Sequence, residues 1–336
     1  MPSLESLGER KIIEIIWKQL NVMPNLPLGF GDDVSAVSLG KDELLVIKTD
    51  MLVDKTDVPR GMSLWQAARK AVVMNISDFA AKGVKPVALL VALGIPQKFT
   101  AKDIEQIGKG LNSGAREYGA YILGGDTNEA SDLVICCALF GTCSASLLMK
   151  REGAEPGDIL AVTGEFGKTA AGLKILLENL PVPSEIENPL LDAVFMPKAR
   201  LKEGLALAVS RAVNAAIDSS DGLAWSLHEL SKASHVGFIV ERLPTAPEAV
   251  KFAEIHGLSH AELCLYGGEE YELVLAIKPE LWDEALDAVK KAGGTLIRIG
   301  KAVKERGVWL KTDKGAEPIE PRGWEHFQSC TGETRG

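Results

Sequence analysis

The sequence predicts an α/β protein made of two domains. The chain has 336 residues. This length exceeds what a single hydrophobic core usually supports, so two domains are expected. In each half, apolar runs that resemble strands alternate with amphipathic stretches at helical spacing, which favours an α/β arrangement. A charged segment with Gly and Pro, residues 150–158, separates the halves. We place the boundary there, giving domains 1–149 and 150–336.

The elements of the first half follow from the spacing of its apolar residues. Residues 7–20 have apolar side chains at helical spacing and predict an amphipathic helix. The elements expected after it are strand 44–49, helix 63–83, strand 87–93, helix 101–118, strand 120–124 and strand 132–143.

The second half opens with strand 158–164 and helix 168–179. A proline-rich stretch, residues 181–189, follows and is interpreted as a linker. The remaining expected elements are helix 198–212, strand 213–217, helix 221–233, strands 236–241 and 271–277, helix 280–292, strand 295–300 and a tail.

Composition and charge disfavour several classes of protein. Hydrophobic residues make up 46% and charged residues 25% of the chain, as in globular proteins. The net charge of −9 argues against nucleic-acid binding, which needs a basic surface. No export signal is visible, and the longest apolar stretch, residues 86–96, is too short to cross a membrane. Five cysteines without a CxxC pair fit a reducing compartment. We therefore expect a cytoplasmic protein that binds neither nucleic acid nor membrane.

Seven aspartates lie beside apolar runs, in short segments that contain Gly or Thr: Asp32, Asp33, Asp50, Asp78, Asp126, Asp218 and Asp221. Burying a carboxylate costs free energy unless its charge is compensated. Few cations lie near these aspartates in the sequence. The pattern therefore predicts a bound metal, most plausibly Mg²⁺ that holds phosphates.

Three of these aspartates are favoured as metal ligands by their placement. Asp50 follows an apolar run and is expected at a strand end, where α/β proteins place ligands. Asp78 shares a helix face with Ala71 and Asn75, in a helix that is otherwise largely apolar. Asp126 follows two glycines at an expected strand end, where a phosphate or metal can approach the backbone.

Ordinary structural roles explain the other acids adequately. The sequence GFGDD around Asp33 is also that of a simple turn, and Asp32 is interpreted as purely structural. Asp221 or Ser220 could cap the helix that follows them, which leaves the role of Asp218 open. Glu272 alternates with apolar neighbours and is expected on a solvated face.

One segment, GEFGKT (164–169), resembles a phosphate-binding loop but lacks the required first glycine, since Val162 stands there. A weak anion site at the N-terminus of the following helix remains open. Lys168 is not assigned a catalytic role.

Seven motifs occur in an order that resembles one family. They are GDD (31–33), TDML (49–52), NISDFAAKGVKP (75–86), GGDT (124–127), IDSSDGL (217–223), GGEEYEL (267–273) and RGWEHF (322–327). Together they resemble the thiamine-monophosphate kinase family, in its archaeal form, of the aminoimidazole-ribonucleotide-synthetase-like (PurM-like) superfamily. Each motif alone is weak, but the resemblance covers nearly the whole chain.

The resemblance implies the two-domain fold of this superfamily, with the N-terminal domains of two subunits pairing through their strands into a homodimer. It implies ATP-dependent phosphorylation of thiamine monophosphate to thiamine diphosphate, by direct in-line transfer with several Mg²⁺ ions. No general base is assigned, because the acceptor phosphate is largely ionised near neutral pH.

The resemblance also assigns residues by position. The metal ligands would be Asp33, Thr49, Asp50, Asp78, Asp126, Asp218 and Asp221, with Lys48 contributing only its backbone carbonyl. The ATP contacts would be Gly125, Asp126, Arg151 and Ser220. Asp57, Glu269 and Trp324 would hold thiamine monophosphate, with the indole packed on a substrate ring.

Three positions depart from the bacterial pattern of the family: Lys48 replaces Ser or Thr, Asp57 replaces His, and Glu270 replaces Asp. Two alternative functions remain open. The first is another ATP-using enzyme of the superfamily, of the selenophosphate or aminoimidazole-ribonucleotide synthesis type. The second is a non-catalytic protein that binds nucleotides or cations with the same acids.

Overall fold

The computed structural model describes residues 4–327, with side chains from residue 7 onward. A five-stranded sheet occupies the first half of the chain, in the order β1-β2-β5-β3-β4. Its strands are β1 (Ser35–Gly40), β2 (Glu43–Val53), β3 (Lys85–Ile95), β4 (Tyr121–Glu129) and β5 (Val134–Ser144). Only β3 and β4 pair in parallel, so this sheet is mixed and mostly antiparallel.

A seven-stranded sheet occupies the second half, in the order β12-β11-β8-β10-β6-β9-β7. Its strands are β6 (Ile159–Val162), β7 (Val213–Asp218), β8 (Gly237–Val240), β9 (Leu273–Ile277), β10 (Ile297–Val303), β11 (Gly307–Thr312) and β12 (Gly315–Pro318). Here β8 and β11 are the parallel pair. The mixed α/β fold expected from the sequence is confirmed.

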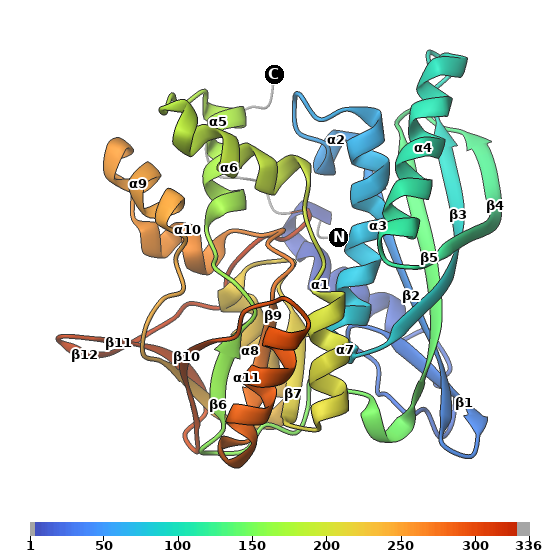
Figure 1. The fold of residues 1–336 in the computed structure, drawn as a ribbon. Helices are drawn as coiled ribbons and strands as arrows, with labels where there is room; N and C mark the ends of the chain where they lie inside the picture. Colours follow the sequence, from blue (N-terminus) through green and yellow to red (C-terminus); the bar gives the residue numbers. More distant parts are fainter. Residues whose placement is uncertain (1–3, 328–336) are drawn as a thin grey trace.

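Helices cover both sheets (Figure 1). In the first half they are α1 (Leu4–Trp17), α2 (Asp54–Asp57), α3 (Leu64–Lys82) and α4 (Ala101–Glu117). In the second half they are α5 (Lys168–Glu178), α6 (Ser184–Phe195), α7 (Leu201–Ser210), α8 (Leu223–Ser234), α9 (Pro247–His256), α10 (His260–Tyr266) and α11 (Trp282–Lys291). None of the helices between residues 4 and 327 combines the length and apolar character needed to cross a membrane.

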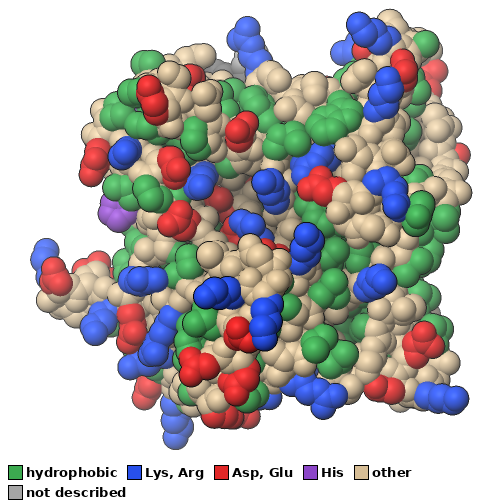
Figure 2. Space-filling view, in the orientation of Figure 1, with side chains coloured by type: hydrophobic (Ala, Val, Ile, Leu, Met, Phe, Trp, Pro, Cys, Tyr) green, Lys and Arg blue, Asp and Glu red, His purple; other side chains and the backbone are tan. Residues whose placement is uncertain are grey.

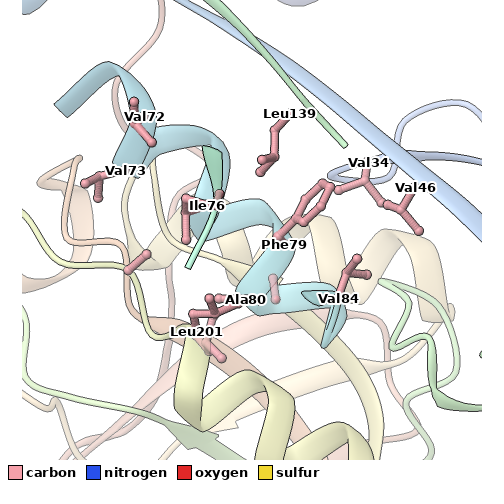
Figure 3. Close-up of a cluster of buried hydrophobic side chains, with 14 of the residues drawn as sticks. Val34, Val46, Val72, Val73, Ile76, Phe79, Ala80, Val84, Leu139 and Leu201 are labelled. Carbon is pink, nitrogen blue, oxygen red and sulfur yellow. The ribbon is translucent and has the colours of Figure 1, made fainter. Parts of the chain in front are cut away.

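Helix α3 lies between the two sheets and joins their cores. Ser63 and Gln66 form a capping box at its start, and Gly83, at a φ of 64°, ends it in the left-handed conformation. Phe79 points toward Val34 and Val46 on one side of the helix (Figure 3). On another side, Ala80 packs against the residues of α7. Because α3 contacts both halves, its polar side chains are buried at their junction.

Close packing of α7 on α3 depends on Gly204. A Cβ atom at this position would lie 2.0 Å from the carbonyl oxygen of Ala80. Leu201, one turn earlier in α7, is also buried in the shared core and lies beside Ala80 in Figure 3. The two halves therefore pack together through direct helix contact.

The structure corrects several boundaries expected from the sequence. Strand β2 continues to Val53, so Asp50 lies within the strand and not at its end. Strand β4 likewise continues to Glu129, which places Asp126 inside it. Backbone hydrogen bonds to the neighbouring strand hold a strand in place. A strand can therefore continue through polar residues when one of its faces is exposed or when it lies at the edge of the sheet.

The expected linker 181–189 is largely helical, because α6 begins at Ser184 and includes Pro189. Burial of Leu190 against Ala171 of α5 outweighs the cost of the proline. Further elements were not expected from the sequence: strands β1, β11 and β12, and helices α2, α9 and α10. In β12 all four residues are exposed, so no apolar pattern marks it.

Candidate active site

Helix α3 presents polar side chains to strand β2. Asn75 accepts a hydrogen bond from the backbone N–H of Asp50 at 3.0 Å and donates one to the carbonyl of Ala71 at 3.0 Å. Asp78, on the same face of α3, forms an ion pair with Lys48 of β2 at 3.0 Å. The helix therefore holds Asp50 and Asp78 near the same lysine.

Three buried carboxylates from distant parts of the chain meet beside α3. One oxygen from each of Asp33, Asp78 and Asp218 lies within 4.8 Å of the others. Ser77 of α3 donates a hydrogen bond to Asp218 of β7 at 2.7 Å. This cluster contains the carboxylate oxygens that Mg²⁺ prefers as ligands.

Burial, together with neighbouring negative charges, raises the pKa values of Asp78 and Asp218. Burial, followed by the charge of Asp33, raises the pKa of Asp218 to about 7. Burial also raises the pKa of Asp78 well above its ordinary value, and Asp218 and Asp50 add to this effect, against the charge of Lys48. A cation bound between these groups would stabilise their charged forms.

Three cations lie in contact with the acids, which corrects the expectation of few nearby cations. Lys48 pairs with Asp50 at 3.1 Å as well as with Asp78. Lys82, fully buried, pairs with Asp33 at 2.8 Å, and Arg151 donates from Nε to Asp33 at 2.7 Å. Burial acts to raise the pKa of Asp33, but the charges of Lys82 and Arg151 outweigh it and lower that pKa.

Asp32 makes structural contacts on both of its carboxylate oxygens. Oδ1 accepts from the backbone N–H of Asp33 at 2.7 Å and pairs with Lys82 at 2.7 Å. Oδ2 accepts from the backbone N–H of Arg151 at 3.1 Å. These contacts agree with the structural role expected for Asp32 and fix the segment that carries Asp33.

Two distant motifs dock on the loop that follows β7. The backbone N–H of Glu269 donates to the carbonyl of Ser220 at 2.6 Å. The backbone N–H of Trp324 donates to the carbonyl of Asp221 at 3.0 Å. Glu269 adopts a left-handed φ of 63°, which turns the chain tightly at this contact. Residues assigned to ATP, metal and substrate thus lie side by side around residues 218–221.

Lys70 of α3 links two residues assigned to the substrate. Its ammonium donates to the carbonyl of Asp57 at 2.8 Å and pairs with the carboxylate of Glu269. One carboxylate oxygen of Asp57 accepts from the backbone N–H of Val53 at 2.7 Å, so this side chain also holds its own turn. Trp324 is 39% exposed, and its ring meets the ring of His326 edge-on, with 5.9 Å between the two centroids.

The structure does not bring every assigned residue into the cluster. The Thr49 hydroxyl lies 3.4 Å from the Cys136 sulfur, on the opposite face of β2 from Lys48 and Asp50. Asp126 is exposed on β4 and pairs in register with the exposed Ala92 of β3. Neighbours in register share a face of the sheet, so Asp126 and the carboxylates beside α3 lie on different faces.

Asp221 and Gly125 also lie outside the three-carboxylate cluster. Burial and the charge of Glu9 raise the pKa of Asp221 to about 6, so α1 forms part of its surroundings. Gly125 is held tightly in the sheet, because a Cβ atom there would lie 1.7 Å from the carbonyl oxygen of Val91.

Two glutamates of the GGEEYEL motif behave differently from expectation. Glu272 is buried, at 3% exposure, and accepts from Thr163 and from Nε of Arg200, both at 2.7 Å; the expected solvated face was wrong. Glu270 accepts from the backbone N–H groups of Gly167 at 2.7 Å and Thr169 at 3.2 Å. The side chain of Glu270 therefore occupies the anion site suggested at the start of α5.

Three site residues, all on α3, were not predicted from the sequence: Lys70, Ser77 and Lys82. The available signal was the presence of lysines in a helix whose other residues are mostly apolar.

Figure 2 shows one face of the molecule, with Lys and Arg side chains around a hollow near its centre and acidic side chains visible inside the hollow. Such a hollow suits a phosphorylated ligand that arrives with cations.

Comparison with known proteins places the chain in a family. Residues 31–143 match the N-terminal domain, and residues 155–311 the C-terminal domain, of AIR synthase related proteins. A thiamine-monophosphate kinase from Nitrosopumilus maritimus is 35% identical over 97% of this chain and 100% of the relative. One from Pyrococcus horikoshii is 36% identical over 89% of this chain and 91% of the relative. The chain belongs to the thiamine-monophosphate kinase family.

Solved structures with the same fold cover nearly the whole chain. AaThiL complexed with AMPPCP and TMP superposes with a TM-score of 0.85 at 27% identity, covering 97% of this chain and 99% of that chain. A Thermus thermophilus protein gives a TM-score of 0.84 at 31% identity, over 95% of this chain and 100% of that chain. The enzyme class expected from the sequence and the two-domain PurM-like fold are thereby confirmed.

Proposed function

We propose that this chain transfers the terminal phosphate of ATP to thiamine monophosphate and releases thiamine diphosphate and ADP. The observation that carries the proposal is the convergence of Glu269 and Trp324 on the loop that holds Ser220, next to Asp218. Family relatives are named for this reaction, and AaThiL was solved with an ATP analogue and TMP. The transfer is direct and in line, with no residue acting as general base.

Mg²⁺ is the proposed cation, and the residues present fit it. The carboxylates of Asp33, Asp78 and Asp218 are close enough to share ions, and Asp50 lies beside them. Burial, followed by the charge of Asp33, raises the pKa of Asp218 to about 7, and a divalent ion would offset both effects by stabilising the charged carboxylate. When bound, Mg²⁺ neutralises charge on the phosphate oxygens. Asp221 would add a ligand from the adjoining loop.

Arg151 and Ser220 are the proposed ATP contacts. The Arg151 guanidinium is 22% exposed and is held by Asp33 on one side and by Glu229, 3.8 Å away, on the other. It is fixed between acids before any ligand arrives, which lowers the entropic cost of clamping a phosphate. Glu269, Trp324 and the turn of Asp57 would hold the acceptor.

A homodimer would give a role to three assigned residues that lie outside the cluster, namely Gly125, Asp126 and Thr49. Their strands β2 and β4, and β3 in the same sheet, expose apolar side chains: Met51 is 56%, Leu123 66% and Leu90 49% exposed. An apolar sheet surface of this kind favours pairing with a second copy. In such a dimer, Asp126 of one copy would complete the site through the paired sheets. We further propose a cytoplasmic location and a domain boundary between residues 149 and 150.

A panel of acceptors tests the proposed function. Purified protein is incubated with ATP, Mg²⁺ and either thiamine monophosphate, thiamine or another phosphorylated acceptor, and products are separated by chromatography. We expect thiamine diphosphate and ADP in equal amounts from thiamine monophosphate alone. ATP binding without ADP release would support the non-catalytic alternative, and turnover of another acceptor would support a different enzyme of the superfamily.

A further inference from the structure

The Lys48 ammonium lies between two carboxylates of the candidate site. Its Nζ atom is 3.1 Å from Oδ1 of Asp50 and 3.0 Å from Oδ2 of Asp78. The side chain is 19% exposed, so water screens these contacts only in part. Lys48 and Asp50 share a face of β2 because they are two residues apart, and that face meets α3 at Asp78.

An ammonium at this point excludes a divalent ion. A cation ligated by both Asp50 and Asp78 would need the same space and the same oxygens. Two positive charges held this close repel each other strongly in a site of reduced dielectric constant. The position between these carboxylates therefore holds either the ammonium or a divalent ion.

Charge compensation is different on the other side of Asp78. Asp33 pairs with both Lys82 and Arg151. Asp218, by contrast, forms no ion pair with any residue between 7 and 327, and the described hydrogen bond to its carboxylate comes from the Ser77 hydroxyl. The negative charge that no described cation compensates is therefore concentrated between Asp78 and Asp218. A divalent ion bound at this position would be stabilised most strongly.

We propose that Lys48 is a built-in cation, which fills the position between Asp50 and Asp78 and lowers by one the number of divalent ions that the chain binds. The inference rests on the proposed function, since it presumes that the other carboxylates bind such ions. It makes Lys48 a positioning residue, because the ammonium fixes Asp50 and Asp78 whether or not an ion is present.

Counting bound Mn²⁺ tests the inference without relying on activity. Mn²⁺ takes the same oxygen ligands as Mg²⁺, and electron paramagnetic resonance measures the free ion at equilibrium with the full chain. Lys48→Thr removes the ammonium and keeps a residue that favours strands. Lys48→Gln keeps the length of the side chain without its charge. Lys85→Thr is the matched control, because Lys85 is an exposed residue of the same sheet.

We expect Lys48→Thr and Lys48→Gln to bind one Mn²⁺ more per chain than the unchanged protein and the Lys85→Thr control. Without divalent ions, both Lys48 variants should unfold at a lower temperature, and saturating Mn²⁺ should remove that difference. Equal numbers of bound ions in the Lys48 variants and the unchanged protein would overturn the inference. An unchanged protein that binds no Mn²⁺ would instead contradict the metal part of the proposed function.

Discussion

The Ser77 hydroxyl on α3 donates a 2.7 Å hydrogen bond to the carboxylate of Asp218 on β7, 141 positions later in the chain. Both residues are buried, and they belong to different halves of the chain. The bond therefore sets the position of Asp218 beside Asp33 and Asp78, and it couples the assembly of the site to the packing of the two halves.

Ser77→Ala should weaken both the fold and ion binding. A buried hydrogen bond to a charged group contributes about 1.5–3 kcal/mol to stability, so urea denaturation should show a loss of this size. The Mg²⁺ concentration needed for half-maximal turnover should rise about 10-fold, as for other residues that orient ligands. An unchanged Mg²⁺ requirement would show that Ser77 does not position Asp218 for ion binding.

Asp78→Asn should nearly abolish turnover while the protein stays folded. The substitution keeps the shape of the side chain but removes the charge that ligates a cation, so the rate should fall about 100-fold or more. Steady-state kinetics with a circular-dichroism spectrum measures both quantities. Asp287→Asn, on the exposed surface of α11, is the matched control and should behave as the unchanged protein. Near-normal activity of Asp78→Asn would refute the ligand assignment.

Arg200→Leu should destabilise the fold because it leaves a buried carboxylate without its cationic partner. Arg200 is a hydrogen-bond donor to Glu272, whose side chain is 4% exposed. Removing one partner of a buried pair costs about 3–5 kcal/mol, which chemical denaturation would detect. Arg298→Leu is a suitable comparison, because Arg298 is an exposed arginine of β10. A similar small loss in both variants would mean that the Arg200 pair contributes little.

Glu270→Gln should change how stability depends on pH. Burial raises the pKa of Glu270 from 4.5 to about 8, against the hydrogen bonds from Gly167 and Thr169. The folded state thus keeps a proton that the unfolded state has lost, so this group makes stability fall as pH rises from about 4.5 to about 8. Gln can still accept both hydrogen bonds but does not titrate. The stability of the variant relative to the unchanged protein should therefore increase across that range and then level off; a constant difference would contradict this role of Glu270.

Much of the fold could be predicted because the apolar spacing of the main elements is regular. Helix α3 and the adjoining strand β3 are marked by long apolar patterns, and their expected ranges differ from those observed by a few residues. Strand β12 and helix α6 could not be predicted in this way. All of β12 is exposed, and α6 depends on burial of Leu190 against another helix.

The candidate site could be predicted in its acids but not in its cations. Asp78 is marked by its apolar helix, whereas Asp33 and Asp218 were indicated as ligands by the family resemblance. The partners of these acids come from elsewhere in the chain, and no local pattern shows that Lys82 reaches Asp33 or that Lys48 reaches Asp78. The placement of Asp126 on the other face of the sheet likewise depends on the register of β3 and β4.

The most direct test of the proposed function follows the transferred phosphate itself. The protein is incubated with Mg²⁺, thiamine monophosphate and ATP that carries a radioactive label in its terminal phosphate. We predict that the label appears in thiamine diphosphate in an amount equal to the ADP formed. Label released only as inorganic phosphate, with thiamine monophosphate unchanged, would contradict the proposed function.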